Sequence, residues 1–289
     1  MRFGAEVAPW FDELPDLLRR LAASWGIELG SPIPRGSVSV VIRCRLQDGR
    51  GGVLKVSPDR ARLANEAAAL QSWSTPHTPA VLALDERLGA LLIEAIEPGT
   101  PLDDSAAYPS LGSVAELLTC LHRDGVPDPS FPPLEQRVAY LFDSSTKLYA
   151  AHPELAERVP RELYDRGRGL AMQLVADAAP TVLLHGDLTP SNILDGGERR
   201  GLVAIDPAPC LGDAAFDAID LVVWQANEIE TIETRSDELA RAIGASPERL
   251  LAWCTAFAAM TALELAVSPD APRERIEAVA ALAARAPAA

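Results

Sequence analysis

The sequence predicts an α+β protein with two lobes of different character. Short β-branched runs, typical of strands, are concentrated in the first 96 residues. Long Ala/Leu-rich segments with helical periodicity occupy most of the chain after residue 105. Only two short apolar runs, TVLLHG and GLVAIDP, interrupt these segments. We therefore expect a small β-rich lobe over residues 1–96, followed by a larger helical lobe over residues 97–289.

Two hairpins and two helical patterns make up the predicted N-terminal lobe. Asp48-Gly49 lies between two β-branched runs, and an Asp-Gly pair in this position is a strong hairpin signal. Pro15 is expected to interrupt the first helical pattern, because proline lacks the N–H of a helical hydrogen bond. In chain order the patterns are a helix at 10–25, strands at 38–46 and 52–57, a helix at 61–73 and a hairpin over 81–99.

The C-terminal lobe is expected to consist of long helices with two short strands among them. The two apolar runs lie at 181–186 and 201–207, and their length suits strands. The joint between the lobes is expected at about residues 95–101. The helical segments are predicted at 110–123, 134–150, 154–178, 214–243 and 247–285.

The net charge of −15 is unevenly distributed along the chain. Residues 1–96 contain 11 Lys/Arg and 11 Asp/Glu, whereas residues 97–289 contain 15 Lys/Arg and 30 Asp/Glu. We expect no nucleic-acid partner, because phosphate contacts demand a basic face. The acidic surplus is explained equally well by solvated helix faces or by attraction of a cationic substrate.

The sequence predicts a cytoplasmic protein. The four cysteines are scattered, with no CxxC pair and no metal-type spacing, so we expect no disulfide framework. The N-terminus lacks a basic segment followed by an apolar core, and no uncharged apolar run reaches the length that spans a bilayer. We therefore expect no membrane partner. A monomer is also expected.

The most informative motif is HGDLTPSN at residues 185–192, directly after an apolar run. Kinase catalytic loops have a His-x-Asp-x-x-x-x-Asn spacing, which His185, Asp187 and Asn192 reproduce. In phosphoryl transfer, one carboxylate must meet the acceptor hydroxyl while a carboxamide oxygen one turn later binds the metal on the nucleotide. Asp187 is therefore the predicted catalytic residue, and Asn192 is a predicted Mg²⁺ ligand.

Asp206 ends the next strand-like segment, GLVAIDP. Mg²⁺ is a hard cation that needs oxygen ligands, and a carboxylate and a carboxamide on adjacent loops supply them. Asp206 is therefore the second predicted Mg²⁺ ligand. The alternative is that both segments are solvated loops in which Asp and Asn only form turns.

HGDLTPSN followed by AIDPAPCLGDAAFD resembles the aminoglycoside phosphotransferase family, in its branch of streptomycin 6-kinases and hydroxyurea phosphotransferases. The resemblance covers most of the chain, from the VLKV strand to the last helices, and is most specific over residues 183–221. It implies the bilobal fold of protein kinases, with ATP bound under the N-terminal lobe and Mg²⁺ as the metal. It also implies phosphoryl transfer to a hydroxyl of a small molecule.

The resemblance assigns further residues to nucleotide binding. Lys55, in VLKV, resembles the strand lysine that reaches the α- and β-phosphates. Glu66 lies in the following predicted helix, where it could face inward and pair with Lys55. Alone, Lys55 would equally suit a strand lysine with a solvated head group. Glu94 to Ile96 match the hinge, whose backbone would hydrogen-bond adenine.

The chain departs from the protein-kinase pattern in its glycine-rich loop and its two catalytic motifs. In place of G-x-G-x-x-G, only Arg35-Gly36-Ser37 precedes the strand, so Gly36 and Ser37 are the predicted phosphate-loop residues. Gly186 replaces an arginine that anchors phosphorylated loops, and Asp-Pro-Ala replaces Asp-Phe-Gly at 206–208. These departures favour a small-molecule kinase without regulation by phosphorylation.

Several polar residues are expected to have structural roles. Asp217 resembles the helix aspartate that caps the catalytic-loop backbone, and Asp213 is a candidate helix N-cap. His185 is expected to pack and hydrogen-bond within the loop rather than act as the base. His77 and His122 are expected to be ordinary surface or boundary residues.

The predicted function is ATP-dependent phosphorylation of a cationic aminoglycoside, with streptomycin as the best candidate, in antibiotic resistance or self-protection. Glu228, Glu230 and Glu233 are candidate contacts for the cation. One alternative is a kinase for another hydroxylated small molecule, such as hydroxyurea. The other is a non-catalytic pseudokinase scaffold, which the intact catalytic, lysine and metal-ligand positions disfavour.

Overall fold

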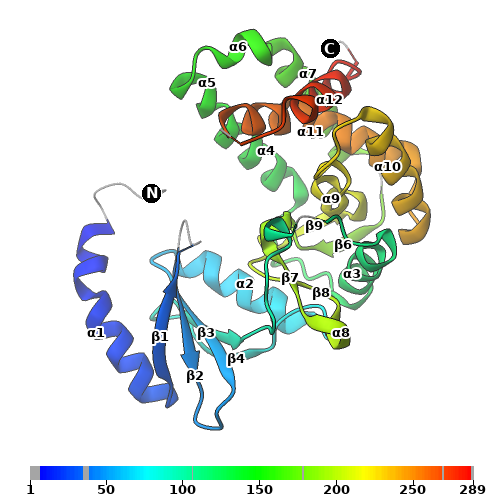
Figure 1. The fold of residues 1–289 in the computed structure, drawn as a ribbon. Helices are drawn as coiled ribbons and strands as arrows, with labels where there is room; N and C mark the ends of the chain where they lie inside the picture. The colour runs from blue at the N-terminus through cyan, green and yellow to red at the C-terminus, as the bar shows by residue number, and fades with distance from the viewer. Residues whose placement is uncertain (1–6, 35–38, 106, 178, 269, 288–289) are drawn as a thin grey trace.

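The computed structural model describes residues 7–34, 39–105, 107–177, 179–268 and 270–287. The chain forms a small lobe built on an antiparallel sheet and a larger, mainly helical lobe (Figure 1). The predicted α+β, two-lobed architecture is confirmed. The predicted boundary after residue 96 stays a prediction; the chain leaves the sheet at Glu94 and enters the next helical turn at Leu102.

The small lobe contains the two predicted hairpins in one sheet. Its strand order is β1-β2-β3-β5-β4, and every neighbouring pair is antiparallel. Gly49 has φ of 85°, a left-handed conformation that glycine adopts without strain, and it forms the turn between β2 and β3. The elements are α1 (Ala8–Trp25), β1 (Glu28–Ile33), β2 (Val40–Arg45), β3 (Gly51–Val56), α2 (Arg60–Ser72), β4 (Val81–Asp85) and β5 (Ala90–Glu94).

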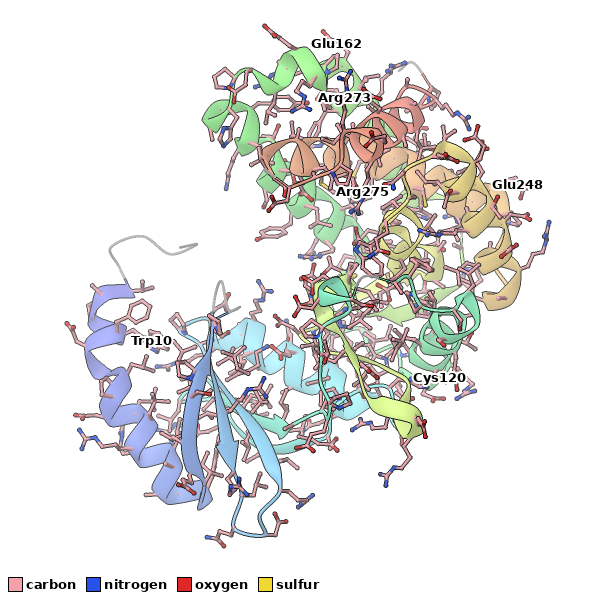
Figure 2. All side chains as sticks on the ribbon, viewed as in Figure 1. Trp10, Cys120, Glu162, Glu248, Arg273 and Arg275 are labelled. Atoms are coloured by element: carbon pink, nitrogen blue, oxygen red, sulfur yellow. The ribbon has the colours of Figure 1, made fainter. Side chains whose placement is uncertain are left out.

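Helix α1 packs its apolar side against the sheet. Leu21 of α1 lies in one buried cluster with Leu54 and Val56 of β3, and Trp10 packs against the same cluster (Figure 2). Pro15 lies inside α1 without ending it, so the predicted interruption is wrong. Packing of an amphipathic face stabilises a helix more than local propensity does, which accounts for its continuity.

The large lobe is a set of helices around two short antiparallel ladders, in which β6 pairs with β9 and β7 pairs with β8. In chain order its elements are η2 (Leu102–Asp104), α3 (Leu111–Asp124), α4 (Leu134–Ser145), α5 (Lys147–Ala151), α6 (Leu155–Arg158), α7 (Arg161–Ala176), β6 (Thr181–Leu184), η3 (Pro190–Asn192), β7 (Ile193–Asp195), α8 (Gly197–Arg200), β8 (Leu202–Ala204), β9 (Cys210–Asp213), η4 (Ala214–Ala218), α9 (Ile219–Val223), α10 (Ile229–Ile243), α11 (Pro247–Val267) and α12 (Arg273–Ala283).

The four segments predicted as single helices from residue 134 onward are each broken in the structure. Pro160 separates α6 from α7, and Pro272 directly precedes α12. Proline disfavours helical backbone in the residue before it, so one helix ends and another begins at such a site. Helices α4 and α5 meet at Thr146, and α9 ends before Trp224. The composition predicted helix correctly but missed these breaks.

Helix α11 is long and apolar enough to cross a membrane by length and composition alone. In this fold it is instead a central packing element, with Leu250, Trp253, Phe257 and Leu263 among its buried residues. It contacts α7, α10 and α12. This packing accounts for its apolar character.

Candidate active site

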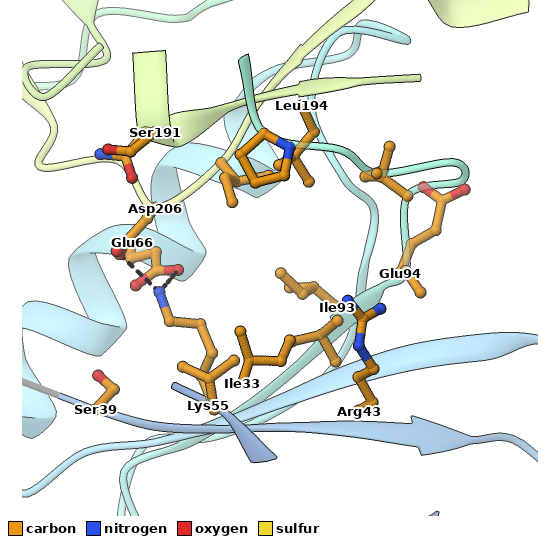
Figure 3. Close-up of a pocket in the computed structure, with 18 of the residues that line it drawn as sticks. Ile33, Ser39, Arg43, Lys55, Glu66, Ile93, Glu94, Ser191, Leu194 and Asp206 are labelled. Carbon is orange, nitrogen blue, oxygen red and sulfur yellow. Dashed lines mark hydrogen bonds and ion pairs between the residues drawn. The ribbon is translucent and has the colours of Figure 1, made fainter. Parts of the chain in front are cut away.

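A cavity of about 350 Å³ lies between the small-lobe sheet and the loops of the large lobe (Figure 3). Side chains alternate between the two faces of a strand. Lys55 of β3 therefore points into the cavity, while its neighbours Leu54 and Val56 pack in the core under α1. The opposite wall includes Ser191, Asn192, Leu194, Ile205 and Asp206.

Lys55 forms ion pairs with two carboxylates at the inner end of this cavity (Figure 3). Its Nζ lies 2.5 Å from Oε1 of Glu66 and 2.7 Å from Oδ1 of Asp206. Burial disfavours the charged form of Lys55, but the two carboxylates outweigh it and raise the pKa of the ammonium. Burial likewise opposes ionisation of Asp206, yet Lys55 holds the pKa of that carboxyl below its usual value. The pairing of Lys55 with Glu66 is as predicted.

Helix α2 places Glu66 on its buried face. Leu63, Ala67 and Leu70 are buried on the same side, at spacings of three and four residues. Asp59 fixes the start of the helix, because its side chain accepts a hydrogen bond from the backbone N–H of Arg62. Glu66 is 2% exposed, and a carboxylate so buried costs free energy unless it is paired. Lys55 supplies that pair.

The ladder of β7 and β8 brings the two predicted metal ligands together. Ile193 pairs with Ala204, and the N–H of Ile205 donates 2.8 Å to the carbonyl oxygen of Asn192. Asp206 follows at once, with φ of 57°. This left-handed conformation is strained for a residue other than glycine, and such strain is typical of functional sites.

The side-chain oxygens of Asn192 and Asp206 fit a hard divalent cation. Asn192 Nδ2 donates 2.9 Å to the carbonyl oxygen of Asp187. Oδ1 of the carboxamide takes no part in this hydrogen bond and can serve as a metal ligand. Both residues line the large cavity, and the Asp206 side chain is 46% exposed. Among the described residues, no cluster of three or more His, Cys, Asp or Glu side chains could hold a metal. Two protein oxygens suit Mg²⁺, which takes its other ligands from phosphates and water.

The predicted hinge residues line the same cavity, whereas the predicted phosphate loop cannot be placed. Glu94, Ala95 and Ile96 contribute to the wall. The Glu94 carboxylate is held by Arg200, with Oε1 2.9 Å from Nη1, and it accepts a hydrogen bond from the backbone N–H of residue 80. Gly36 and Ser37 lie outside the described residues.

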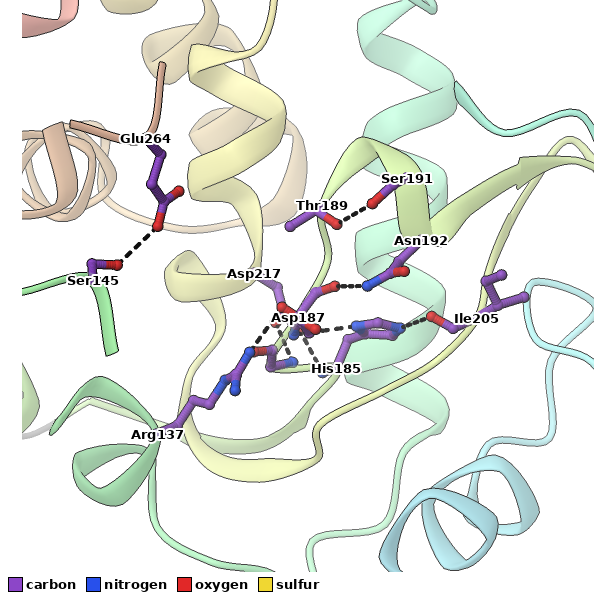
Figure 4. A network of polar contacts seen from close by, with 11 residues as sticks. Arg137, Ser145, His185, Asp187, Thr189, Ser191, Asn192, Ile205, Asp217 and Glu264 are labelled. Atoms are coloured by element: carbon purple, nitrogen blue, oxygen red, sulfur yellow. Dashed lines mark hydrogen bonds and ion pairs between the residues drawn. The ribbon is translucent and has the colours of Figure 1, made fainter. Parts of the chain in front are cut away.

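The predicted catalytic loop, residues 185–192, follows β6 and is held by the buried Asp217, as expected (Figure 4). Its two carboxylate oxygens accept hydrogen bonds from the backbone N–H groups of His185, at 2.8 Å, and Gly186, at 2.9 Å. Gly186 has φ of 74°, and a Cβ there would lie 2.1 Å from the carbonyl oxygen of Ala208. This close approach explains why glycine replaces the arginine of protein kinases.

The histidines around this loop are hydrogen-bonded and largely buried. His185 donates from Nε2 to the carbonyl oxygen of Ile205 at 3.0 Å, while Nδ1 accepts the N–H of Asp187 at 3.3 Å. Burial lowers the pKa of His185, which suits the predicted packing role. The prediction for His77 and His122 is wrong in part. His77 is buried and contacts a carbonyl oxygen, and His122 Nε2 lies 3.0 Å from Asp217 Oδ2.

Asp187 itself is held by Arg137, which the sequence did not reveal (Figure 4). Arg137 Nη2 donates 2.8 Å to Asp187 Oδ1, and Arg137 Nε donates 2.7 Å to the carbonyl oxygen of Gly186. Arg137 lies on α4, fifty residues before Asp187, within an ordinary helical pattern. No local motif marked it.

A second cavity of about 170 Å³ opens beside Asp187 in the large lobe. Asp220 and Glu264 also line it, together with apolar residues of α4, α9 and α11. Glu264 accepts a 2.8 Å hydrogen bond from Ser145. Glu264 is the only charged residue between Leu250 and Val267, and a carboxylate in such an apolar stretch is a signal that would have singled it out. Of the described residues that line this cavity, none is among the predicted contacts Glu228, Glu230 and Glu233.

Asp220 is held in an environment that disfavours its charge. Burial, and then the nearby carboxylates of Glu264 and Asp187, raise its pKa to about 7. Within the described part of the chain, no hydrogen bond or ion pair involves its carboxylate. Burial also raises the pKa of Glu264. A positively charged ligand in this cavity would relieve the repulsion among these three groups.

The chain matches one family of kinases over most of its length. Residues 24–267 match the model of the aminoglycoside/hydroxyurea antibiotic resistance kinases. Streptomycin 6-kinase of Streptomyces glaucescens is 28% identical over 263 residues, which span 87% of this chain and 82% of that protein. Hydroxyurea phosphotransferase of Kitasatospora aureofaciens is 30% identical over 264 residues, which span 88% of this chain and 74% of that protein.

The fold is also similar to that of solved kinase structures. A choline/ethanolamine kinase family protein from Mesorhizobium loti matches with a TM-score of 0.61 and 21% identity, covering 94% of this chain and 93% of that one. This likeness confirms the predicted kinase-like fold. The match of residues 24–267 includes the lysine strand, the catalytic loop and both cavities described above. The chain therefore belongs to the aminoglycoside/hydroxyurea antibiotic resistance kinase family.

Proposed function

We propose that this enzyme transfers the γ-phosphoryl group of ATP to a hydroxyl of a cationic aminoglycoside, with streptomycin as the best candidate, and so serves antibiotic resistance or self-protection. One observation carries the proposal. The catalytic loop separates two cavities, with Asn192 and Asp206 facing the larger one and Asp187 facing the smaller, acidic one. A donor and an acceptor could therefore meet at a single loop.

The larger cavity suits a nucleotide. Apolar side chains on its two sides would enclose a purine ring, and Lys55 lies at its inner end, where phosphates would need a cation. Asn192 and Asp206 would hold Mg²⁺, which would neutralise charge on the phosphates. The apolar lining includes Ile33, Val41, Val53, Ile93, Leu194 and Ile205.

Asp187 would act on the acceptor. Its carboxylate would accept a hydrogen bond from the acceptor hydroxyl and take the proton as the new O–P bond forms and the bond to ADP breaks. His185 is unsuited to this role, because its Nε2 donates to the carbonyl oxygen of Ile205 and its Nδ1 accepts the N–H of Asp187. Positioning by the loop and charge neutralisation by Lys55 would supply most of the rate enhancement.

The acidic cavity supports a cationic acceptor. Asp220 and Glu264 would contact an ammonium or guanidinium group while Asp187 faces the hydroxyl. At about 170 Å³ the cavity is smaller than a typical drug-sized site, so it would take one part of an aminoglycoside. The same small volume favours the second candidate, a compact acceptor such as hydroxyurea.

The test is ATP turnover with streptomycin, other aminoglycosides and hydroxyurea as separate acceptors. We expect kcat/KM to be highest for streptomycin, with mass spectrometry showing one added phosphoryl group. Asp187→Asn should lower kcat by about 10²- to 10⁴-fold, while ATP affinity changes by no more than a few-fold. Turnover of hydroxyurea alone would reject the cationic acceptor, and an Asp187→Asn variant with near-parental turnover would reject the catalytic role.

A further inference from the structure

Arg137 makes two contacts that together fix the orientation of Asp187. Its guanidinium donates to Oδ1 of that carboxylate at 2.8 Å and to the preceding carbonyl oxygen, of Gly186, at 2.7 Å. The guanidinium group is planar and rigid, so two donors bound to successive residues restrict rotation of the carboxylate. Within the described part of the chain, Arg137 is the only residue that forms an ion pair with Asp187.

The contact leaves the second carboxylate oxygen of Asp187 available. Within the described part of the chain, the polar contacts of this side chain involve Oδ1 alone. The side chain is 29% exposed and faces the acidic cavity. An acceptor hydroxyl could therefore reach Oδ2 while Oδ1 stays with Arg137.

Arg137 is itself firmly placed. Its side chain is 11% exposed. Val138 and Phe142, on the same helix α4, are buried in the core. Helix α4 packs against α7 and β9. The guanidinium also lies 5.6 Å from the centre of the Tyr140 ring. A helix outside the catalytic loop thus fixes the orientation of a side chain within it.

We propose that Arg137 is a positioning residue for phosphoryl transfer: it holds the Asp187 carboxylate in the rotamer that presents Oδ2 to the acceptor. The inference rests on the proposed role of Asp187. This role differs from that of a purely structural contact between α4 and the loop. Loss of a structural contact would lower stability, and its effect on kcat would not depend on the Asp187 carboxylate.

The kinetic test is a double-mutant cycle with the acceptor that the parent phosphorylates best. Arg137→Met should lower kcat by about 10- to 100-fold, because small displacements of a catalytic group have effects of this size. The ATP dissociation constant should stay within about twofold. The kcat of Arg137→Lys should lie between those of the parent and Arg137→Met, because one ammonium cannot reproduce both contacts of the guanidinium, with Asp187 and with the Gly186 carbonyl oxygen. In the Asp187→Asn background, Arg137→Met should lower kcat by less than about twofold more.

Arg249 offers a matched control. Like Arg137, it binds a carboxylate, with Nε 2.5 Å from Asp213 Oδ2, and a backbone carbonyl, that of Leu174, at 2.8 Å. Arg249→Met should lower the melting temperature, and the kcat that remains in the folded fraction should be nearly parental. Equal kcat losses in Arg249→Met and Arg137→Met would show that loss of any buried arginine–carboxylate contact lowers turnover. That result would overturn the proposal.

A crystal structure of Arg137→Met gives a readout that needs no acceptor. We expect the Asp187 carboxylate to rotate or to occupy more than one rotamer. An Asp187 carboxylate that does not move would overturn the role of Arg137. So would kcat losses of Arg137→Met and Asp187→Asn that multiply in the double variant. Failure of the proposed function has a different signature, in which the parent phosphorylates no acceptor or Asp187→Asn remains active.

Discussion

Lys55 can stay charged in a buried position because two carboxylates contact it. The residue is 5% exposed, and an isolated buried ammonium would tend to lose its proton. Glu66 is also buried, whereas Asp206 is half exposed toward the cavity. Burial raises the pKa of Glu66, while its ion pair with Lys55 acts in the opposite direction. Lys55 contacts only Oδ1 of Asp206, which leaves Oδ2 for the proposed metal.

The proposed metal ligands can be tested by calorimetry of nucleotide binding. Asp206→Ala and Asn192→Ala each delete an oxygen ligand from a cation that tolerates few poor substitutes. Each variant should therefore weaken ATP binding in the presence of Mg²⁺ and change it little without the metal. If Mg²⁺ enhances ATP binding equally in the parent and both variants, these residues are not its ligands.

The raised pKa of Asp220 makes the stability of the protein depend on pH. Its ordinary value of 3.8 rises to about 7, through burial and the carboxylates of Glu264 and Asp187, while Arg137 and Arg275 act in the opposite direction. The folded protein thus retains a proton that the unfolded chain has lost between these values. The stabilisation from this proton is therefore greatest at low pH and is lost as the pH rises through about 7.

Asp220→Asn should remove this dependence, because the amide does not ionise. We expect the variant to be more stable than the parent at pH 8, by at most about 4 kcal/mol, with a much smaller difference at pH 5. Urea unfolding at both pH values measures this. The KM of a cationic acceptor for the parent should also rise as the pH falls below 7, as Asp220 loses its charge. A constant stability difference from pH 5 to pH 8 would contradict the assignment.

At the residue level, the sequence revealed the groups whose spacing is set by chemistry. His185, Asp187 and Asn192 lie in one short loop, so their separation along the chain reflects their separation in space. Arg137 comes from another element, and nothing local distinguishes it from a surface arginine of a helix. Residues that tertiary packing brings to the site were therefore missed.

At the level of elements, the turn after β6 must pass very close to the segment after β8. Gly186 permits this approach because it has no Cβ. The two segments are also joined by a hydrogen bond, in which the N–H of Ala208 donates 2.9 Å to the carbonyl oxygen of His185. A side chain at residue 186 would therefore push apart the segments that carry Asp187 and Asp206. The positive φ of Gly186 adds a backbone cost of about 1–2 kcal/mol for any L-residue.

Gly186→Ala should lower both stability and turnover. The added methyl group would collide with a backbone atom, which has less freedom to move than a flexible side chain. We expect a loss of at least 1–3 kcal/mol in the free energy of unfolding, measured by urea titration, and a fall in kcat among the molecules that remain folded. Gly169 is a useful control, because no atom lies within 4 Å of a Cβ added there. Equal effects of Gly186→Ala and Gly169→Ala would refute the steric argument.

Local sequence patterns predicted the type of each helix or strand better than its boundaries or the strand it pairs with. The β2–β3 hairpin was marked by Asp-Gly, because a tight turn has strict backbone requirements. The pairing of β6 with β9 and the breaks near Thr146 and Trp224 depend on packing between distant segments. Ala/Leu-rich composition is compatible with one long helix or two short ones, so it could not distinguish them.

At the scale of the whole molecule, charge separates the two lobes. Residues 1–96 are balanced in charge, and residues 97–289 carry the full net charge of −15. The contacts predicted from this surplus, Glu228, Glu230 and Glu233, stay a prediction. Glu233 pairs with Arg285 on the surface, whereas Glu264 lines the cavity beside Asp187. The long-range field, however, depends on the sum of charges more than on their register.

This field leads to a prediction about salt. A cationic acceptor that approaches the acidic lobe should be attracted over several ångströms, and dissolved ions screen that attraction over about 8–10 Å at physiological ionic strength. The kcat/KM of streptomycin should therefore fall several-fold as KCl rises from about 50 to 500 mM, while that of neutral hydroxyurea changes little. The KM of ATP over the same range is the necessary control, because Mg·ATP is itself charged. A flat response with streptomycin would mean that the acidic surplus only solvates the surface, and that acceptor binding depends on short-range contacts with Asp220 and Glu264.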